Sequence, residues 1–380
     1  MNDSTTFLSR DLAEHLELRE SATRFLSENY SLERRRKTVG SGRGYDRDIW
    51  GAFADLGWLA IPFPESDGGL EGGSRSLASL MTALGPAAVV EPYLDGVVLA
   101  GSLLSRCPAG PLRSELIETT IAGKGYSTVA ILDLSRRTPD QPTTLAASWK
   151  SGAIELRGQA TLVPGASQCD TILVPARDSD DGSLAIYAVP PSEAKIDSYP
   201  MLDGGLASDV TLDGIRVPAS HILADSRTAS DALEHALRMA TYCACVEGVS
   251  IMETLIRASA QYICERKQFG RQLSEFQALQ HMLADMTIAY ARADASTWMA
   301  GQFIDSTDSN QRDRVLAAAK YEMGQSGRFI GQRAVQLHGA IGMTDELIIG
   351  HHFKRLVSLD LLYGGWLNHL QRFAAFGLAS

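Results

Sequence analysis

The helical spacing of apolar residues is interrupted once in this chain, between about Ser127 and Val217. Across that stretch, short apolar runs alternate with turn-forming clusters such as Asp178-Ser179-Asp180-Asp181-Gly182 and Asp203-Gly204-Gly205. Short apolar runs bounded by such clusters are typical of β-strands. The runs are Val129–Leu132, Ile154–Leu156, Thr171–Val174, Leu184–Val189 and Val210–Val217. The sequence therefore predicts a small antiparallel sheet domain with helical regions before and after it.

The flanking regions carry apolar residues three and four positions apart, which is the spacing of one helix face. Leu8–Arg36 is acidic early and basic late, as the helix dipole favours, and Leu56–Leu70 is a turn-rich loop between helices. Beyond Ser226 the pattern is helical almost to the end and predicts a helical bundle. The positions that carry the pattern are Leu77, Leu80, Met81, Leu84, Met252, Leu255, Ile256, Tyr262, Ile263, Phe276, Leu279, Leu283, Met286 and Tyr290.

The chain has 380 residues, more than one domain of about 100–200 residues, so we expect several domains. The fold class is α+β, mainly α. The expected domains are an N-terminal α-helical domain at 1–124, a middle β-sheet domain at 125–224 and a C-terminal helical bundle at 225–380.

Charge and cysteine content exclude several classes of function. The net charge of −10 argues against nucleic acid as a partner, because proteins that bind it present a basic surface. The longest uncharged stretch, Ser76–Val90, is shorter than the ~20 residues of a membrane-spanning helix, and the acidic first thirty residues do not resemble a secretory signal. Five cysteines in apolar surroundings predict buried, reduced thiols and no metal site. They are Cys107, Cys169, Cys243, Cys245 and Cys264. We therefore expect a cytoplasmic protein without a membrane span.

Two segments of the C-terminal region carry the most informative pattern. The first is Glu265–Leu273, continued by Phe276–His281 and Leu283–Met286, and the second is Gln336–Glu346. They resemble the signature and the glycine motif of the acyl-CoA dehydrogenase family. Weaker similarity at Leu56–Leu70 and at Arg216-Val217-Pro218 extends the resemblance over nearly the whole chain.

The resemblance implies the acyl-CoA dehydrogenase fold, with a C-terminal four-helix bundle, and FAD as cofactor. It also implies α,β-dehydrogenation of an acyl-CoA thioester, in which a carboxylate removes the α-proton and the β-hydrogen leaves as hydride to the flavin. In that family both motifs reach across a subunit interface to the adenosine end of a neighbour's flavin. The residue types agree, because a guanidinium binds phosphate oxygens bidentately, amides hydrogen-bond, and glycines let backbone approach a ligand. The expected FAD-binding residues are Arg266, Gln268, Phe269, Gln277, Gln336, Gly339 and Gly342.

The two places where the family carries its catalytic base hold no carboxylate here. With a one-residue insertion, the family's Tyr-Glu-Gly segment corresponds to Tyr363-Gly364-Gly365 and its base position to Gly364; without the insertion, the base position falls on Tyr363. The alternative helical position falls on Ala240. Glu247 lies in an apolar run, where burial favours a usable base, and Asp360 lies one turn before Gly364. We expect Glu247 to be a hydrogen-bonded interface residue and Asp360 an exposed or helix-capping acid, so no residue of this chain is assigned as catalytic.

The sheet domain also differs from the family where the flavin ring is held. Leu132–Asp140 replaces a Thr-Glu-Pro loop, and Leu162-Val163-Pro164 replaces a Trp-Ile-Thr strand. Pro164 has no backbone N–H to offer. We expect the chain to hold the adenosine end of a partner's FAD and no flavin ring of its own.

This asymmetry is similar to the small subunits of heteromeric acyl-CoA dehydrogenases, such as the pimeloyl-CoA and steroid side-chain types. The expected function is an FAD-dependent acyl-CoA dehydrogenase subunit that joins a second such chain in a heterotetramer, acts on acyl-CoA and passes electrons to electron-transfer flavoprotein. Three alternatives stay open: a self-sufficient homo-oligomer using Glu247 or Asp360, a catalytically silent interaction protein of the same fold, and an unrelated helical scaffold. His338 is expected to be structural, because a neutral histidine bonded to backbone is commoner there than a proton carrier.

Overall fold

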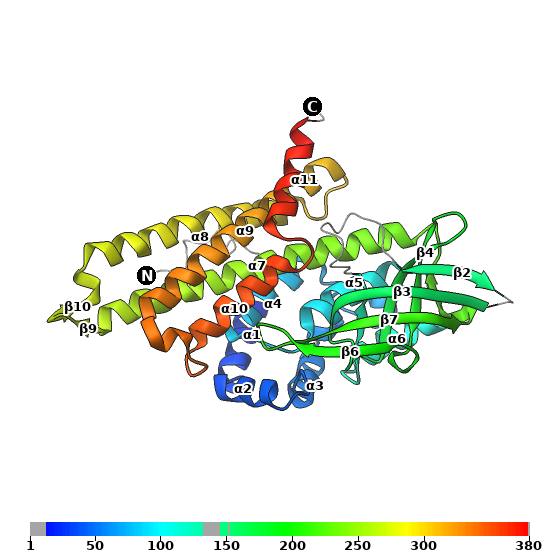
Figure 1. The fold of residues 1–380 in the computed structure, drawn as a ribbon, viewed down its shortest axis with the longest axis horizontal. Helices are drawn as coiled ribbons and strands as arrows, with labels where there is room; N and C mark the ends of the chain where they lie inside the picture. The colour runs from blue at the N-terminus through cyan, green and yellow to red at the C-terminus, as the bar shows by residue number, and fades with distance from the viewer. Residues whose placement is uncertain (1–12, 132–144, 151–152, 379–380) are drawn as a thin grey trace. The chain divides into compact units, whose positions relative to one another are not determined.

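A computed structural model describes residues 13–131, 145–150 and 153–378 of the chain. These residues form two compact units (Figure 1). The first unit comprises residues 1–37, 74–89 and 241–380, and the second comprises residues 38–73 and 90–240. The first unit thus combines helices from both ends of the chain, while the second holds the sheet. The expected division into three domains at residues 124 and 224 stays a prediction.

The first unit is helical. Its elements are α1 (Ala13–Asn29), α2 (Leu32–Gly40), α4 (Gly73–Ala87), α7 (Ala229–Glu265, which begins in the second unit), α8 (Gln277–Phe303), α9 (Ser309–His338), α10 (Ile348–Leu361) and α11 (Trp366–Leu378). α9 packs against α8, α10 and α11, which confirms the expected bundle. Met252, Leu255 and Met286 are fully buried in it, whereas Leu279 and Leu283 are only half-buried.

The single helix expected over Leu8–Arg36 is wrong within the described residues, because α1 and α2 are separate helices. The Ser31 hydroxyl accepts the backbone N–H of Arg34 at 3.1 Å. A serine in this place caps the N-terminus of a new helix, which explains why the chain restarts at Leu32.

The second unit combines short helices with an eight-stranded sheet. Its helices are α3 (Arg47–Asp55), the π-helix η4 (Tyr93–Leu99), α5 (Ala100–Arg106) and α6 (Pro111–Ile121), with 3₁₀ turns at Trp58–Ala60 and Glu65–Asp67 inside the predicted loop. The strands are β1 (Ser127–Val129), β2 (Ala146–Lys150), β3 (Ala153–Pro164), β4 (Thr171–Asp178), β5 (Leu184–Val189), β6 (Lys195–Pro200), β7 (Leu206–Val217) and β8 (Ile222–Ala224).

The sheet is mixed, which corrects the expectation of a purely antiparallel one. Its order is β6-β7-β3-β2-β4-β5-β8, and both β1 and β2 pair with β4 in parallel. β2, β6 and β8 were not expected as strands. β6 is an edge strand whose side chains are exposed or half-buried, so it lacks the apolar run by which a strand is found in a sequence.

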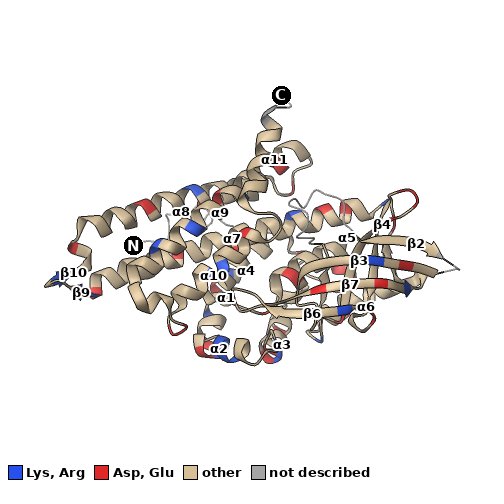
Figure 2. Cartoon of the chain, viewed as in Figure 1, with Lys and Arg blue, Asp and Glu red and all other residues tan. Residues whose placement is uncertain are grey.

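Among the described residues, one helix, α7, is long and apolar enough to cross a membrane, but 83% of its most apolar window is buried inside the protein. Acidic and basic residues occur on most other elements of the two units (Figure 2). The prediction of buried thiols is right for four cysteines and wrong for Cys264, which is exposed. Cys264 follows buried Ile263 by one position, and one residue turns a side chain by about 100° around the helix.

The C-terminus of α4 is closed by a pair of backbone hydrogen bonds. The N–H of Val89 donates to Leu84 O and that of Ala88 to Gly85 O, which is the pattern of a Schellman motif. Its left-handed residue is usually glycine, but here it is Ala88, with φ +52°. Side chains of the same unit complete the cap: Arg35 Nε donates to Ala88 O at 2.8 Å, and His352 Nε2 lies 3.1 Å from Pro86 O. Burial lowers the pKa of His352 to about 4.

We expect Ala88→Gly to stabilise the protein. The left-handed conformation strains an alanine but not a glycine, so the substitution should raise the free energy of unfolding by about 0.5–1 kcal/mol after the larger unfolded-state entropy of glycine is offset. The measurement is urea denaturation. Ala87→Gly is the control, because residue 87 is helical; it should lower the free energy of unfolding, and the same sign for both variants would contradict the assignment.

Candidate functional site

The first motif forms a hairpin directly after α7. β9 (Lys267–Gln268) pairs with β10 (Arg271–Gln272), and the residues between them, Phe269 and Gly270, have φ of +54° and +81°. Positive φ at both central positions is typical of a type I′ turn. The turn leaves Phe269 88% exposed. An aromatic ring held in this way is available to another molecule.

Phe276, immediately before α8, fixes the orientation of the hairpin. Its ring meets that of Phe269 edge-on, with the ring centroids 6.2 Å apart, and the guanidinium of Arg271 lies 3.9 Å from the Phe276 centroid. Edge-to-face and cation–π contacts of this kind stabilise specific geometries. The hairpin is therefore an oriented structure.

The second motif follows the end of α9. Gly339, with φ +66°, turns the chain into a 3₁₀ segment, Gly339–Met343. His338 is buried, and its Nδ1 donates to Ala334 O at 2.8 Å. Burial lowers the pKa of His338, which favours the neutral ring. A Cβ on Gly342 would lie 3.0 Å from His338 Cβ, so glycine permits this close approach. These contacts support the structural role expected for His338.

The structure brings the two motifs together at one end of the first unit. Tyr262, four residues before Arg266, has its ring centroid 4.5 Å from that of His338, one residue before Gly339. The Tyr262 hydroxyl also lies 3.4 Å from His338 O. The end of α7 and the end of α9 are thus neighbours.

Most of the expected FAD-binding residues lie at the surface of this end. Arg266, Gln268, Phe269, Gln277, Gln336 and Gly339 are exposed, and Gly342 is buried. Among residues 13–131, 145–150 and 153–378, no side-chain hydrogen bond or ion pair engages Arg266 or the three glutamines. Their N–H donors are available to phosphate oxygens and to other hydrogen-bonding groups of a ligand. In residue type, this set fits the adenosine diphosphate end of FAD.

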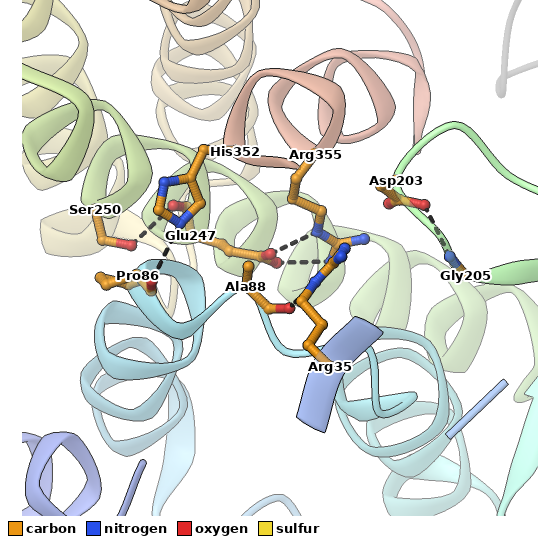
Figure 3. Close-up of polar contacts among 9 residues, drawn as sticks. All are labelled: Arg35, Pro86, Ala88, Asp203, Gly205, Glu247, Ser250, His352 and Arg355. Carbon is orange, nitrogen blue, oxygen red and sulfur yellow. Dashed lines mark hydrogen bonds and ion pairs between the residues drawn. The ribbon is translucent and has the colours of Figure 1, made fainter. Parts of the chain in front are cut away.

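The carboxylate of the candidate base Glu247 forms an ion pair (Figure 3). Arg355 Nε and Nη2 contact the two carboxylate oxygens of Glu247 at 2.6 and 2.9 Å, and the Glu247 side chain is 5% exposed. Such bidentate pairs are strong and geometrically specific. The pair joins α7 to α10, and each carboxylate oxygen accepts one N–H of Arg355.

The other positions considered for a catalytic base are also buried. Ala240 is fully buried in α7 and Gly364 is buried after α10. Asp360 is 2% exposed, which corrects the expectation of an exposed acid; its Oδ1 accepts the N–H of Trp366, so it contacts the start of α11 as a capping acid does.

In the strand segment that was not expected to hold a flavin ring, backbone groups form hydrogen bonds with other residues of the protein. Leu162 adopts φ +53° where β3 bulges, and its N–H contacts Tyr199 Oη at 3.1 Å and Asp209 Oδ1 at 3.3 Å. Pro164 O accepts the Thr128 hydroxyl at 2.7 Å. These residues do not fit the flavin ring, because their backbone groups already have partners in the sheet. Leu132–Asp140 lies outside the described residues.

Sequence reasoning missed Lys320, which is fully buried in α9. Its Nζ donates to Leu359 O and Asp360 O, each at 2.8 Å, and burial lowers its pKa to about 8. The only signal for it was its position directly after the apolar run Leu316–Ala319. That run predicts a buried face, and a lysine one turn from Leu316 falls on the same face.

Two models of protein domains match the chain: the acyl-CoA dehydrogenase N-terminal domain over residues 13–101 and the acyl-CoA dehydrogenase C-terminal domain over residues 230–366. "Acyl-CoA dehydrogenase FadE28" of Mycobacterium tuberculosis is 27% identical, covering 87% of this chain and 93% of that protein. The ChsE4-ChsE5 complex from Mycobacterium tuberculosis matches with a TM-score of 0.87 at 22% identity, over 97% of this chain and 98% of that one. A glutaryl-CoA dehydrogenase from Mycobacterium smegmatis, solved with FADH2, matches with a TM-score of 0.86 at 16% identity, over 97% and 96%. The two structural likenesses show the fold.

We expect Glu247→Gln to destabilise the protein by about 3 kcal/mol, because it removes the negative partner of a bidentate ion pair in a nearly buried position. The measurement is the free energy of unfolding in urea. Glu253→Gln on the same helix is the matched control: its partner Arg257 is 65% exposed, so its effect should stay below about 0.5 kcal/mol. Equal effects of the two substitutions would show that the Glu247–Arg355 pair contributes no more than a surface pair.

Proposed function

The chain belongs to the acyl-CoA dehydrogenase family, FAD-dependent oxidoreductases acting on CH–CH bonds, and we propose that it works as the subunit that completes a partner chain's flavin site. The observation that carries the proposal is a contrast within the first unit. Arg266, Gln268, Gln277 and Gln336 are exposed, and their side chains have no partner in the part of the chain that the structure describes, whereas Glu247 and Asp360 are buried and hydrogen-bonded.

The exposed residues suit the charged end of FAD. Arg266 directly follows α7, and its planar guanidinium can contact two oxygens of a diphosphate. The glutamines offer both donors and acceptors, and Phe269 offers an aromatic face. FAD held by these residues would supply the acceptor for the hydride that leaves the β-carbon of the acyl group, and a carboxylate base would remove the α-proton. In this proposal the partner supplies that carboxylate and the ring pocket.

The partner is a second acyl-CoA dehydrogenase chain, and the assembly is a heterotetramer. The likeness to the ChsE4-ChsE5 complex, which contains two differently named chains, supports this reading. An acyl-CoA thioester as substrate, electron-transfer flavoprotein as acceptor, a cytoplasmic location and a three-domain layout belong to the same proposal. The free thiols of all five cysteines agree with a reducing compartment.

The test is to purify the tagged chain from its own organism, record mass and flavin absorbance, and mix the sample anaerobically with acyl-CoA esters. We expect a complex with a second chain whose flavin is bleached at a rate on the order of 10 per second. The chain purified alone and supplied with FAD should bleach no flavin. Bleaching by the chain alone would support the self-sufficient enzyme, and a complex without flavin would support the silent interaction protein.

Arg266→Ala should weaken FAD binding by the complex about 10- to 150-fold, because a hydrogen bond to a charged group contributes about 1.5–3 kcal/mol. Arg266→Lys should restore part of the affinity, since lysine keeps the charge without the planar fork. Flavin retained after gel filtration is the readout. Arg257→Ala, nine residues earlier on α7, is the matched control and should keep full flavin content. Full occupancy in Arg266→Ala would rule out the contact.

A further inference from the structure

The glycine motif and the start of α10 are in close contact. A Cβ on Gly350, in the first turn of α10, would lie 3.0 Å from Gly342 O and 3.8 Å from Thr344 O. The N–H and the hydroxyl of Thr344 both donate to Ile341 O, at 3.1 and 2.8 Å. α10 therefore packs against the backbone of the segment that carries two of the expected FAD-binding residues, Gly339 and Gly342.

His351 of α10 contacts the end of this segment. It is 7% exposed; its Nε2 lies 3.1 Å from Asp345 O, and its Nδ1 lies 2.8 Å from Arg35 Nη1. A guanidinium can only donate, so Nδ1 is the acceptor and the ring is neutral. The proton of a neutral ring with Nδ1 as acceptor is on Nε2, which therefore donates to Asp345 O. We call these two contacts the His351 anchor.

Arg35 connects the anchor to a second helix end. Arg35 is 3% exposed, and its Nε donates to Ala88 O at 2.8 Å, directly after α4 (Figure 3). Its guanidinium thus bonds to α10 through His351 and to the end of α4 at the same time. A residue of α2 is in this way connected to the backbone after the glycine motif, although Arg35 and His351 are 316 positions apart.

We propose that His351, oriented by Arg35, is a positioning residue that holds the glycine motif in its FAD-binding conformation only while the imidazole ring is neutral. The inference rests on the proposed function and deepens it, because it adds acid-sensitive control of the same FAD site. A second proton on the ring would lie on Nδ1, facing the guanidinium of Arg35 and leaving its N–H without an acceptor. Protonation therefore favours release of His351, and with it release of Asp345 O.

The surroundings of His351 disfavour that second proton. The charged and titratable groups that act on His351 are Arg35 on α2, Asp345 before α10, and His352 and Lys354 on α10, with the Glu247–Arg355 pair one turn further along. Burial, reinforced by the charge of Arg35, lowers the pKa of His351 below the ordinary value of histidine, although the contacts with Asp345 act in the opposite direction. Because the pKa is lowered, the anchor is fully formed above about pH 6.5 and is lost as the pH falls towards the pKa of the buried ring.

Amide hydrogen exchange in the isolated chain tests the anchor without any flavin. The readout is the protection factor of the Thr344 N–H between about pH 7.5 and about pH 5.5. In the parent it should fall by up to about tenfold per pH unit below about pH 6.5, because release takes up one proton. His351→Gln keeps an acceptor and a donor but does not titrate, so its protection should stay constant. A parent that keeps its protection in acid, or a glutamine variant that loses it equally, would overturn the anchor.

Three further variants separate the anchor from a general effect of acid. His351→Leu neither accepts nor donates, so it should show low protection of Thr344 at every pH. His352→Gln is the matched control: His352 contacts Pro86 O and not the glycine motif, so this variant should keep the pH dependence of the parent. Arg35→Gln removes the cation beside the ring and should raise the pH at which half of the protection is lost. An unmoved midpoint in Arg35→Gln would overturn the role of Arg35.

FAD affinity of the purified complex tests the functional consequence. Between about pH 7.5 and about pH 5.5, the Kd of the parent for FAD should rise at least about fivefold more than that of His351→Gln. Equal pH dependence of the two would overturn the control of the FAD site.

Arg266→Ala distinguishes failure of this inference from failure of the proposed function. If Arg266→Ala releases FAD while His351→Leu retains it at every pH, the positioning role is wrong and the proposed function stands. If Arg266→Ala also retains FAD, the flavin contact is wrong, and the exchange measurements alone decide whether His351 holds the motif.

Discussion

Helix ends that stop inside the protein impose the constraint on which the first unit depends. The last carbonyls of a helix have no partner within it, and burying them without donors is unfavourable. α4 ends against the donors of Arg35 and His352, and α10 ends against Lys320. These donors are cations or neutral imidazole N–H groups, which suit the negative end of a helix dipole. Directed polar bonds between distant helices therefore decide where the helices stop, and apolar packing fills the space between them.

Much of the fold was predictable because it follows from local periodicity. Leu77, Leu80, Met81 and Leu84 recur at helical spacing, and all four are buried in α4. Strand direction was not predictable, because a run of apolar residues looks the same whichever way its neighbour runs. The break before α2 depended on one serine hydroxyl, a signal too small to outweigh a continuous charge pattern.

The candidate site likewise contains features that the sequence could predict and features that it could not. The motif residues near Arg266 and Gln336 could be chosen from the resemblance of their segments to a family's motifs, and their chemistry agrees. The contact between Tyr262 and His338 places them at one end of the unit. The partner of Glu247 could not be chosen, because Arg355 is 108 positions away and only the packed helices bring them together. Lys320 shows the same limit, since its acceptors are backbone carbonyls that no sequence pattern marks.

The hairpin at Phe269 has a consequence for how two chains associate. A flexible loop that becomes ordered on binding loses conformational entropy at that moment, and the loss weakens the complex. Phe269 is already fixed by a two-residue turn, a ring contact with Phe276 and a positive φ. The strain of that backbone is borne during folding, when the whole chain becomes ordered together. In the complex that we propose, assembly then resembles the meeting of two rigid surfaces, with little reorganisation between encounter and final complex.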